Sequence, residues 1–339
     1  MQLPSPRGVL SEQLFARLYG EPGPLPGGPR VGGLDDDDFQ ISLFLLQELS
    51  FRRLEGVDPA WEEEPSLLAL RAALERQLEE ELRDRITVPT CRPTDVARTL
   101  VELLDKADGP SLSTWVETHA TLSHLREFVV HRSAYQLKEA DPHSFAIPRL
   151  SAGRAKTALL EIQLDEYGHM EPSEAHAELF RATMNEFGLR PGAHIDLLPA
   201  VTLRTNTVLN CFTRSRRLLG ACLGHLAVFE MTSVEPMARY AAACRRLLPG
   251  PRGTRAARFY DVHVAADGFH QRIALDRLVA GFAEQYPDES TELLFGAAAL
   301  MRVEAELARH VLQCWNAGMT SLRDPLDEST LRLPTSTAA

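Results

Sequence analysis

The sequence predicts an all-α protein built as a helical bundle. Apolar residues recur at spacings of three and four through most of the chain, which is the period of one face of an α-helix. Between residues 65 and 85 the residues that follow this period are Leu67, Leu70, Leu74, Leu78 and Leu82. No long alternating run of β-branched residues occurs, so strands are not expected. No repeat of fixed length is evident, which favours a bundle over a solenoid.

The bulk composition is that of a folded protein. Hydrophobic residues make up 44% of the chain and charged residues 24%, which excludes wholesale disorder. The 339 residues suffice for one large domain or two modest ones. The net charge of −11 argues against a nucleic-acid partner, because phosphate binding needs a basic surface. We therefore expect a small-molecule substrate and no nucleic acid.

The five cysteines indicate a reducing compartment. Their number is odd, no CxxC pair occurs, and most lie in apolar surroundings, so we interpret them as buried thiols. No stretch approaches the ~18 apolar residues that a membrane span needs. The first ten residues lack the charged and apolar regions of a signal peptide. We expect a cytoplasmic protein without a membrane partner.

Four regions follow one another along the chain. Residues 1–34 include a Pro/Gly-rich stretch and should be a flexible N-terminal segment. Residues 35–108 should form an N-terminal helical unit, and the acidic run Asp35–Asp38 would stabilise the start of its first helix. Residues 109–323 should form the main helical domain, and residues 324–339, rich in Pro, Ser and Thr, a disordered tail. In the main domain we expect helices at roughly 113–140, 152–167, 172–188, 196–210, 213–231, 234–248, 255–285, 289–296 and 298–317.

The segment FYDVHVAADGFHQRIA carries the strongest chemical signal. His263, Asp267 and His270 occupy positions i, i+4 and i+7, so they project from one face of a helix. The rest of the segment is largely apolar, which favours burial, and buried imidazoles and carboxylates need partners. A shared metal ion would satisfy all three groups at once. A surface face with scattered polar residues would show the same spacing, so the triplet alone leaves both interpretations open.

A second candidate pair flanks the helix break YGHMEPSE. Glu166 shares a helical stripe with Ala155, Leu159 and Ile162, and therefore faces the apolar side of its helix. His176 opens the next helix, so the two side chains could share a metal ion. On its own, Glu166 could also be a salt-bridged residue at a helix end.

Two further carboxylates complete the candidate set. Glu230 ends the segment GHLAVFE, in a helix so apolar that it must be buried, and a carboxylate there would be neutralised or paired. His225 on the same helix is rotated by about 140° from Glu230 and is interpreted as a core histidine. Glu139 lies near the end of a long helix that stops before Pro142, and by itself it resembles an exposed helix-end acid.

Together these residues are typical of a two-metal site. Three histidines and four carboxylates are distributed over several predicted helices. Imidazole suits iron, and bridging carboxylates allow two cations to sit ~3.5–4 Å apart. Helical bundles are the usual scaffold for di-iron carboxylate centres. The paired Glu-x-x-His motifs of ferritin-like centres are missing from this chain, so its site must be built differently.

The chain resembles the haem-oxygenase-like di-iron oxidases and oxygenases, often described as iron-containing redox enzymes. The resemblance rests on EIQLDEYG with a histidine downstream, on the GHLAVFEMTS helix and on the H-x3-D-x2-H motif. It covers residues 110–323 and implies a haem-oxygenase-like helical bundle with an extra N-terminal helical unit, which some members use for dimerisation. It also implies that the iron ligands are Glu139, Glu166, His176, Glu230, His263, Asp267 and His270.

The resemblance further implies an O2-dependent enzyme. Members of the family bind two Fe(II) ions, react with O2 to give a peroxo-di-iron species and oxidise a small substrate by N-oxygenation, desaturation or oxidative C–C cleavage. We therefore expect two Fe(II) ions, O2 as co-substrate, and an amino-acid-like or other carboxylate metabolite in a biosynthetic pathway. A homodimer is expected, and an external electron donor is a further expected partner. Asp165 and Tyr167 are candidates for orienting the ligands.

Several alternatives remain open at this point. A protein of the same fold without iron could be a metal-free binding or scaffold protein, although all seven ligand positions are intact. A thiamin-salvage hydrolase would need a cysteine near the pocket, and a haem-degrading enzyme would need a proximal histidine such as His119 or His124. Neither enzyme explains the H-x3-D-x2-H motif. Arg149, Arg204 and Arg239 could each pair with a substrate carboxylate, but each could equally form an ordinary salt bridge.

Overall fold

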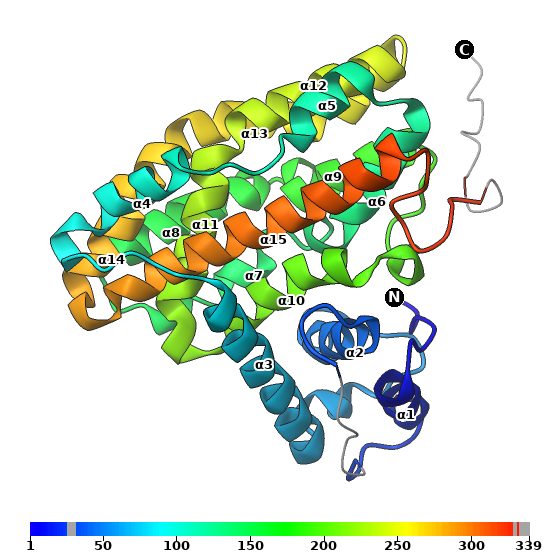
Figure 1. Ribbon diagram of the computed structural model, residues 1–339, viewed down its shortest axis with the longest axis horizontal. Helices are drawn as coiled ribbons and strands as arrows, with labels where there is room; N and C mark the ends of the chain where they lie inside the picture. The colour runs from blue at the N-terminus through cyan, green and yellow to red at the C-terminus, as the bar shows by residue number, and fades with distance from the viewer. Residues whose placement is uncertain (26–31, 328–330, 332–339) are drawn as a thin grey trace.

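Two long helices cross at the centre of the computed structural model, which describes residues 1–25, 32–327 and 331 (Figure 1). Helix α15 (Ser290–Asn316) packs along α11 (Leu219–Thr232), and small residues let their backbones touch. A Cβ atom added at Gly224 would lie 1.9 Å from the carbonyl oxygen of Leu293, and one at Gly296 would lie 1.9 Å from that of Ala221. Only glycine fits at either position, because any larger residue would push the two helices apart.

Four further helices carry or flank most of the residues of the site described below. They are α6 (Leu122–Gln136), α8 (Arg154–Glu166), α9 (His176–Glu186) and α13 (Pro251–Arg272). Helix α12 (Val234–Leu247) packs against α13 over most of its length and lies beside it in Figure 1. Helix α13 continues without a break into a π-helical segment, Ile273–Val279, and then into α14 (Ala280–Gln285).

Helices α1 (Val9–Leu18), α2 (Asp37–Glu48) and α3 (Pro65–Arg85) lie together below the bundle in Figure 1. Helices α4 (Val96–Asp105) and α5 (Leu112–His119) pack on the bundle itself, α4 against α15 and α5 against α12. Helix α2 packs on α10 (Ala200–Arg214), and every residue from Phe39 to Glu48 is buried. The remaining short elements are α7 (Asp141–Ser144) and 3-10 turns at Pro59–Glu63, Pro93–Asp95, Ile147–Arg149, Gly168–Met170, Pro172–Glu174, Ile195–Leu197, Arg216–Leu218 and Pro287–Glu289.

A buried ion pair joins α2 to the bundle. The ammonium group of Lys138, just after α6, contacts the carboxylate of Glu48 at the end of α2, and both side chains are almost fully buried. Lys138 also lies 4.3 Å from the centre of the Phe51 ring, which adds a cation–π contact. Removing either partner of such a pair would leave an uncompensated buried charge.

The expectation of a flexible segment over residues 1–34 was wrong for its helical part. Residues 9–18 form α1, which buries Leu14 and Phe15 against the core. The backbone N–H groups of Leu10 and Ser11 donate to the Asp38 carboxylate, each at 2.8 Å, so α2 caps α1. The local sequence did not predict this helix, because the carboxylate that caps it lies 27 residues further along the chain. Residues 26–31 of that segment, and residues 328–330 and 332–339 of the predicted tail, lie outside the described residues.

The predicted helices of the main domain differ from the structure mainly at their ends. The helix expected at 113–140 is split, because the Thr121 side chain accepts a hydrogen bond from the backbone N–H of His124 and starts α6 there. The helices expected at 289–296 and 298–317 are one helix, α15. Among the described residues no single helix combines the length and apolar composition of a membrane span, and one bent pair, Arg216–Thr232 with Val234–Leu247, meets that test by length and composition only.

Candidate metal centre

Helix α13 turns three polar side chains into the bundle. His263, Asp267 and His270 are exposed by only 4%, 2% and 1%, whereas Gly268 and Phe269 beside them face solvent. The i, i+4, i+7 spacing therefore lies on the buried face of the helix, as predicted. The alternative that these three residues form a solvent-exposed polar face is excluded.

A first cluster of possible ligand atoms gathers around His263. It contains Glu139, Glu166 and His176, and one ligand atom from each of the four residues lies within 4.8 Å of the others. His263 Nε2 is 3.6 Å from Glu139 Oε2, and His176 Nδ1 is 2.9 Å from Glu166 Oε2. Glu166 ends α8 and His176 opens α9, so the helix break between them brings the two side chains together.

A second cluster adjoins the first and shares one residue with it. Glu166, Glu230 and His270 also place ligand atoms within 4.8 Å of one another. His270 Nδ1 lies 3.0 Å from Glu230 Oε2 and 3.5 Å from Asp267 Oδ1. The Glu166 carboxylate therefore stands between the two clusters, where its oxygens could bridge two cations.

Four buried atoms of these clusters have no hydrogen-bond partner. They are Glu139 Oε2, Glu166 Oε2, His176 Nδ1 and Asp267 Oδ1. The 2.9 Å contact between Glu166 and His176 is close, yet its geometry does not make a hydrogen bond. Leaving four such groups buried and unpaired would cost several kcal/mol. Each of these oxygen and nitrogen atoms can bind a cation through a lone pair, so the residues fit a metal centre.

Contacts behind the histidines fix which ring nitrogen faces each cluster. His263 Nδ1–H donates to the carbonyl oxygen of Phe259 at 2.8 Å, which leaves Nε2 toward Glu139. His270 Nε2 lies 2.5 Å from Asp165 Oδ2, which leaves Nδ1 toward Glu230. Such contacts set the tautomer and orientation of imidazole ligands in metal sites. The hydroxyl of Ser233 donates to Asp267 and orients that carboxylate in the same way.

The buried carboxylates and imidazoles of the two clusters shift one another's pKa values. Burial raises the pKa of Glu230 to about 8. Burial would lower the pKa of His263, but the adjacent Glu139 carboxylate raises it to about 10. Burial likewise opposes a raised pKa at His270, yet hydrogen bonds to Asp267 and Glu230 bring it to about 11. Without cations, protons on the imidazoles balance the carboxylates, so metal binding would release them.

The structure brings all seven predicted residues together, including Glu139, which lies in the turn after α6. Asp165, predicted to orient a ligand, contacts His270, whereas Tyr167 contacts Asp141 and Ser144 instead. His225 packs against His143 with ring nitrogens 3.3 Å apart, as expected for a core histidine. The three arginines considered for substrate binding are engaged elsewhere. Arg204 pairs with Asp35 and Glu306, Arg239 with Glu235, and Arg149 with backbone carbonyl groups.

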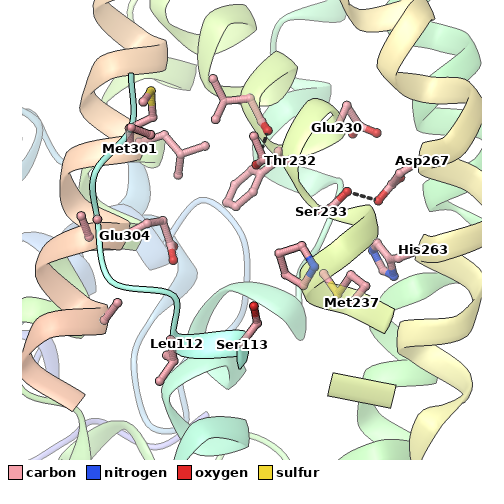
Figure 2. A pocket seen from close by; sticks show the side chains of 18 of the residues that line it. Leu112, Ser113, Glu230, Thr232, Ser233, Met237, His263, Asp267, Met301 and Glu304 are labelled. Carbon is pink, nitrogen blue, oxygen red and sulfur yellow. Dashed lines mark hydrogen bonds between the residues drawn. The ribbon is translucent and has the colours of Figure 1, made fainter. Parts of the chain in front are cut away.

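A cavity of about 630 Å³ opens onto the candidate centre. In Figure 2 Glu230, His263 and Asp267 stand on one side of it, and Met301 and Glu304 of α15 stand on the other. The segment from Leu103 to Ser113 forms a third wall. Its volume suits a small organic ligand.

Sequence reasoning missed two charged residues in this cavity. Arg132 on α6 donates from both terminal nitrogens to the Glu304 carboxylate, at 2.8 and 2.7 Å. Glu139 lies in the turn after α6, so a helical spacing from Glu139 does not lead to Arg132. Glu304 lies 172 residues away from Arg132, and no local pattern connects them.

Comparison with known proteins places this geometry in a family. A family model described as iron-containing redox enzyme matches residues 126–305, which is more than half of the chain. No curated protein matches the chain. The matched region includes all seven candidate ligands, and the all-helical bundle is the haem-oxygenase-like fold of that family. This chain belongs to the iron-containing redox enzyme family.

Proposed function

We propose that the chain is a non-haem di-iron enzyme that uses O2 to oxidise a small metabolite. The proposed ligands of the two Fe(II) ions are Glu139, Glu166, His176, Glu230, His263, Asp267 and His270. The observation that carries the proposal is the pair of adjoining clusters, which share Glu166 and contain four buried atoms without a partner.

The donor set matches two divalent iron ions in charge and chemistry. Three imidazoles and four carboxylates are ligands that iron accepts, and none of the described thiols lines the cavity. Two Fe(II) ions carry four positive charges, which would neutralise four carboxylates. Glu139, His176 and His263 would hold one ion, Glu230, Asp267 and His270 the other, with Glu166 between them.

The bound iron would supply O2 activation and the oxidising power for the reaction. The residues of the chain perform the other tasks. Asp165 and the Phe259 carbonyl hold two imidazoles in the orientation that presents a free nitrogen to the centre. Ser233 holds the Asp267 carboxylate in place. The cavity walls admit a substrate beside the centre and limit the access of water to it.

Three observations favour this function over the alternatives. A metal-free scaffold protein would have no use for four unpaired polar atoms in its core. A haem-degrading enzyme would need a proximal histidine near the start of the bundle's first helix, but the candidates there, His119 and His124, pack on Trp115 and do not line the cavity. No cysteine in the described part of the chain lines the cavity, which disfavours a thiol-dependent hydrolase.

Iron stoichiometry tests the proposal. The wild type and a His263→Ala/His270→Ala double variant are loaded with Fe(II) without O2, desalted and assayed for iron. A His119→Ala/His124→Ala variant is the matched control, because it removes the same number of imidazoles outside the centre.

We expect about two irons per chain in the wild type and the control, and a loss of iron in the His263/His270 variant. Equal iron in all three proteins would refute the ligand assignment. No iron in a folded wild type, with no transient absorption on mixing with O2 and excess Fe(II), would refute the function.

A further inference from the structure

The Arg132–Glu304 pair is a charged feature of the α15 side of the cavity. The apolar side chains that line the cavity include Leu103, Leu112, Met237, Leu300 and Met301, and polar groups such as the Ser113 and Tyr240 hydroxyls lie among them. The two charged side chains remain 19% and 25% exposed, and both line the cavity. A substrate in this cavity therefore meets more apolar than polar surface, with this ion pair on its α15 side.

The hydrogen bonds of the pair leave the carboxylate, not the guanidinium, available to a ligand. Both terminal nitrogens of Arg132 donate to Glu304, and its guanidinium lies 5.6 Å from the centre of the Phe128 ring, with Tyr240 beside it. Each Glu304 oxygen accepts only one of these bonds and keeps a further lone pair. Burial lowers the pKa of Arg132, but Glu304 more than offsets this and raises it, so the guanidinium stays charged.

A carboxylate on the substrate would be a poor match for this wall. To reach Arg132 it would have to displace Glu304 and leave that side chain as an unpaired negative charge beside it. A protonated amine can donate to Glu304 without disturbing Arg132, and its charge adds to the attraction. Lys106 and Arg309, which also line the cavity, are exposed to solvent, so their charges are screened by water.

The pair is separated from the candidate metal centre along the cavity. Arg132 lies within α6, whereas Glu139 lies in the turn that follows this helix. Figure 2 likewise shows Glu304 on the opposite side of the cavity from His263 and Asp267. A substrate that contacts both would therefore be held by one end and oxidised near the other.

We propose that the cavity selects a substrate with a protonated amine on an apolar body, and that Glu304, supported by Arg132, is the residue that recognises the amine. The amine binds at α15, and the reacting part of the substrate points to the Glu139 side of the cavity. This inference rests on the proposed function only in treating the cavity as the substrate site.

Binding of three ligands that share one alkyl chain tests the inference. Octylamine, octanoate and octanol are titrated into the protein by calorimetry, both after anaerobic Fe(II) loading and after treatment with a chelator. The second condition removes direct ligation of octanoate to iron. Iron content is measured on the same samples, so that failure of metal binding and failure of amine recognition are recorded separately.

We expect the wild type to bind octylamine at least about tenfold more tightly than octanoate or octanol, as for a charged hydrogen bond. Glu304→Gln should weaken octylamine by about ten- to a hundredfold and strengthen octanoate, because Arg132 is then free. Glu292→Gln is the matched control. Glu292 lies on α15 like Glu304 and also pairs with an arginine, Arg83 of α3, but it does not line the cavity. It should leave the three affinities unchanged.

A second variant keeps the test decisive if Glu304→Gln does not fold. Arg132→Met/Glu304→Met replaces the pair by apolar side chains, which is often neutral for stability. In this variant octylamine should lose its advantage over octanol. A wild type that prefers octanoate, or a folded Glu304 variant that keeps the amine preference, would overturn the inference whatever the iron content.

Discussion

The crossing of α11 and α15 gives a prediction whose size follows from one contact. Replacing Gly224 by alanine puts a Cβ atom 1.9 Å from the carbonyl oxygen of Leu293, where ordinary contact begins at 3.4 Å. The helices would have to separate by about 1.5 Å, because a backbone carbonyl within a helix cannot rotate away. Overpacking of this kind lowers the free energy of unfolding by about 1–3 kcal/mol or more. The higher helix propensity of alanine offsets up to about 1 kcal/mol of this loss. We expect a net loss of about 2 kcal/mol.

Urea unfolding followed by circular dichroism measures this loss. Gly268→Ala is the matched control, since Gly268 is also inside a helix, yet a Cβ there meets nothing within 4 Å. The control should become more stable by about 0.5–1 kcal/mol. A Gly224→Ala protein within about 0.5 kcal/mol of wild type, or a control that is destabilised equally, would refute the argument from helix contact.

Three further predictions concern the metal centre and the buried histidines. Asp165→Asn should lower Fe(II) affinity by about ten- to a hundredfold in a competition with a chelator, because Asp165 orients His270, and an unchanged affinity would exclude that role. Iron loading should raise the unfolding temperature of the wild type but not of His263→Ala/His270→Ala, as differential scanning fluorimetry would show. Burial lowers the pKa of His131 from 6.5 to about 3, so the unfolded chain binds that proton first and folding stability falls as pH drops through this window. Between pH 7 and pH 5 the wild type should lose about 2 kcal/mol that His131→Gln retains, and equal losses in urea titrations would contradict this.

The sequence predicted those parts of the site that local periodicity determines. The spacing of His263, Asp267 and His270 places them on one face in any helix, and the apolar segment around Glu230 requires burial. The position of Glu139 was harder to predict, because this residue lies in a turn after α6 and helical periodicity does not determine its direction toward His263.

Features that depend on distant partners were not predictable from local patterns. Helix α1 was missed because its apolar face is stable only against α2, with Asp38 as its cap. The Arg132–Glu304 pair joins α6 to α15, and a single sequence does not reveal which acid meets which base across that separation. The break before α6 was not predicted, because threonine occurs both inside helices and as an N-cap, and Thr121 is the N-cap of α6.

The buried pair between Lys138 and Glu48 limits how the protein can be shortened. The family match begins at residue 126, so trimming the chain to that boundary would seem a natural way to isolate the catalytic part. Such a fragment would keep Lys138 but discard Glu48 and Phe51, exposing a cation that is now enclosed. Lys138 is next to Glu139 in the sequence, so loss of its contacts with Glu48 and Phe51 would alter the position of a candidate metal ligand. The matched region therefore lacks residues that enclose Lys138, and expression trials should retain α2 and Phe51.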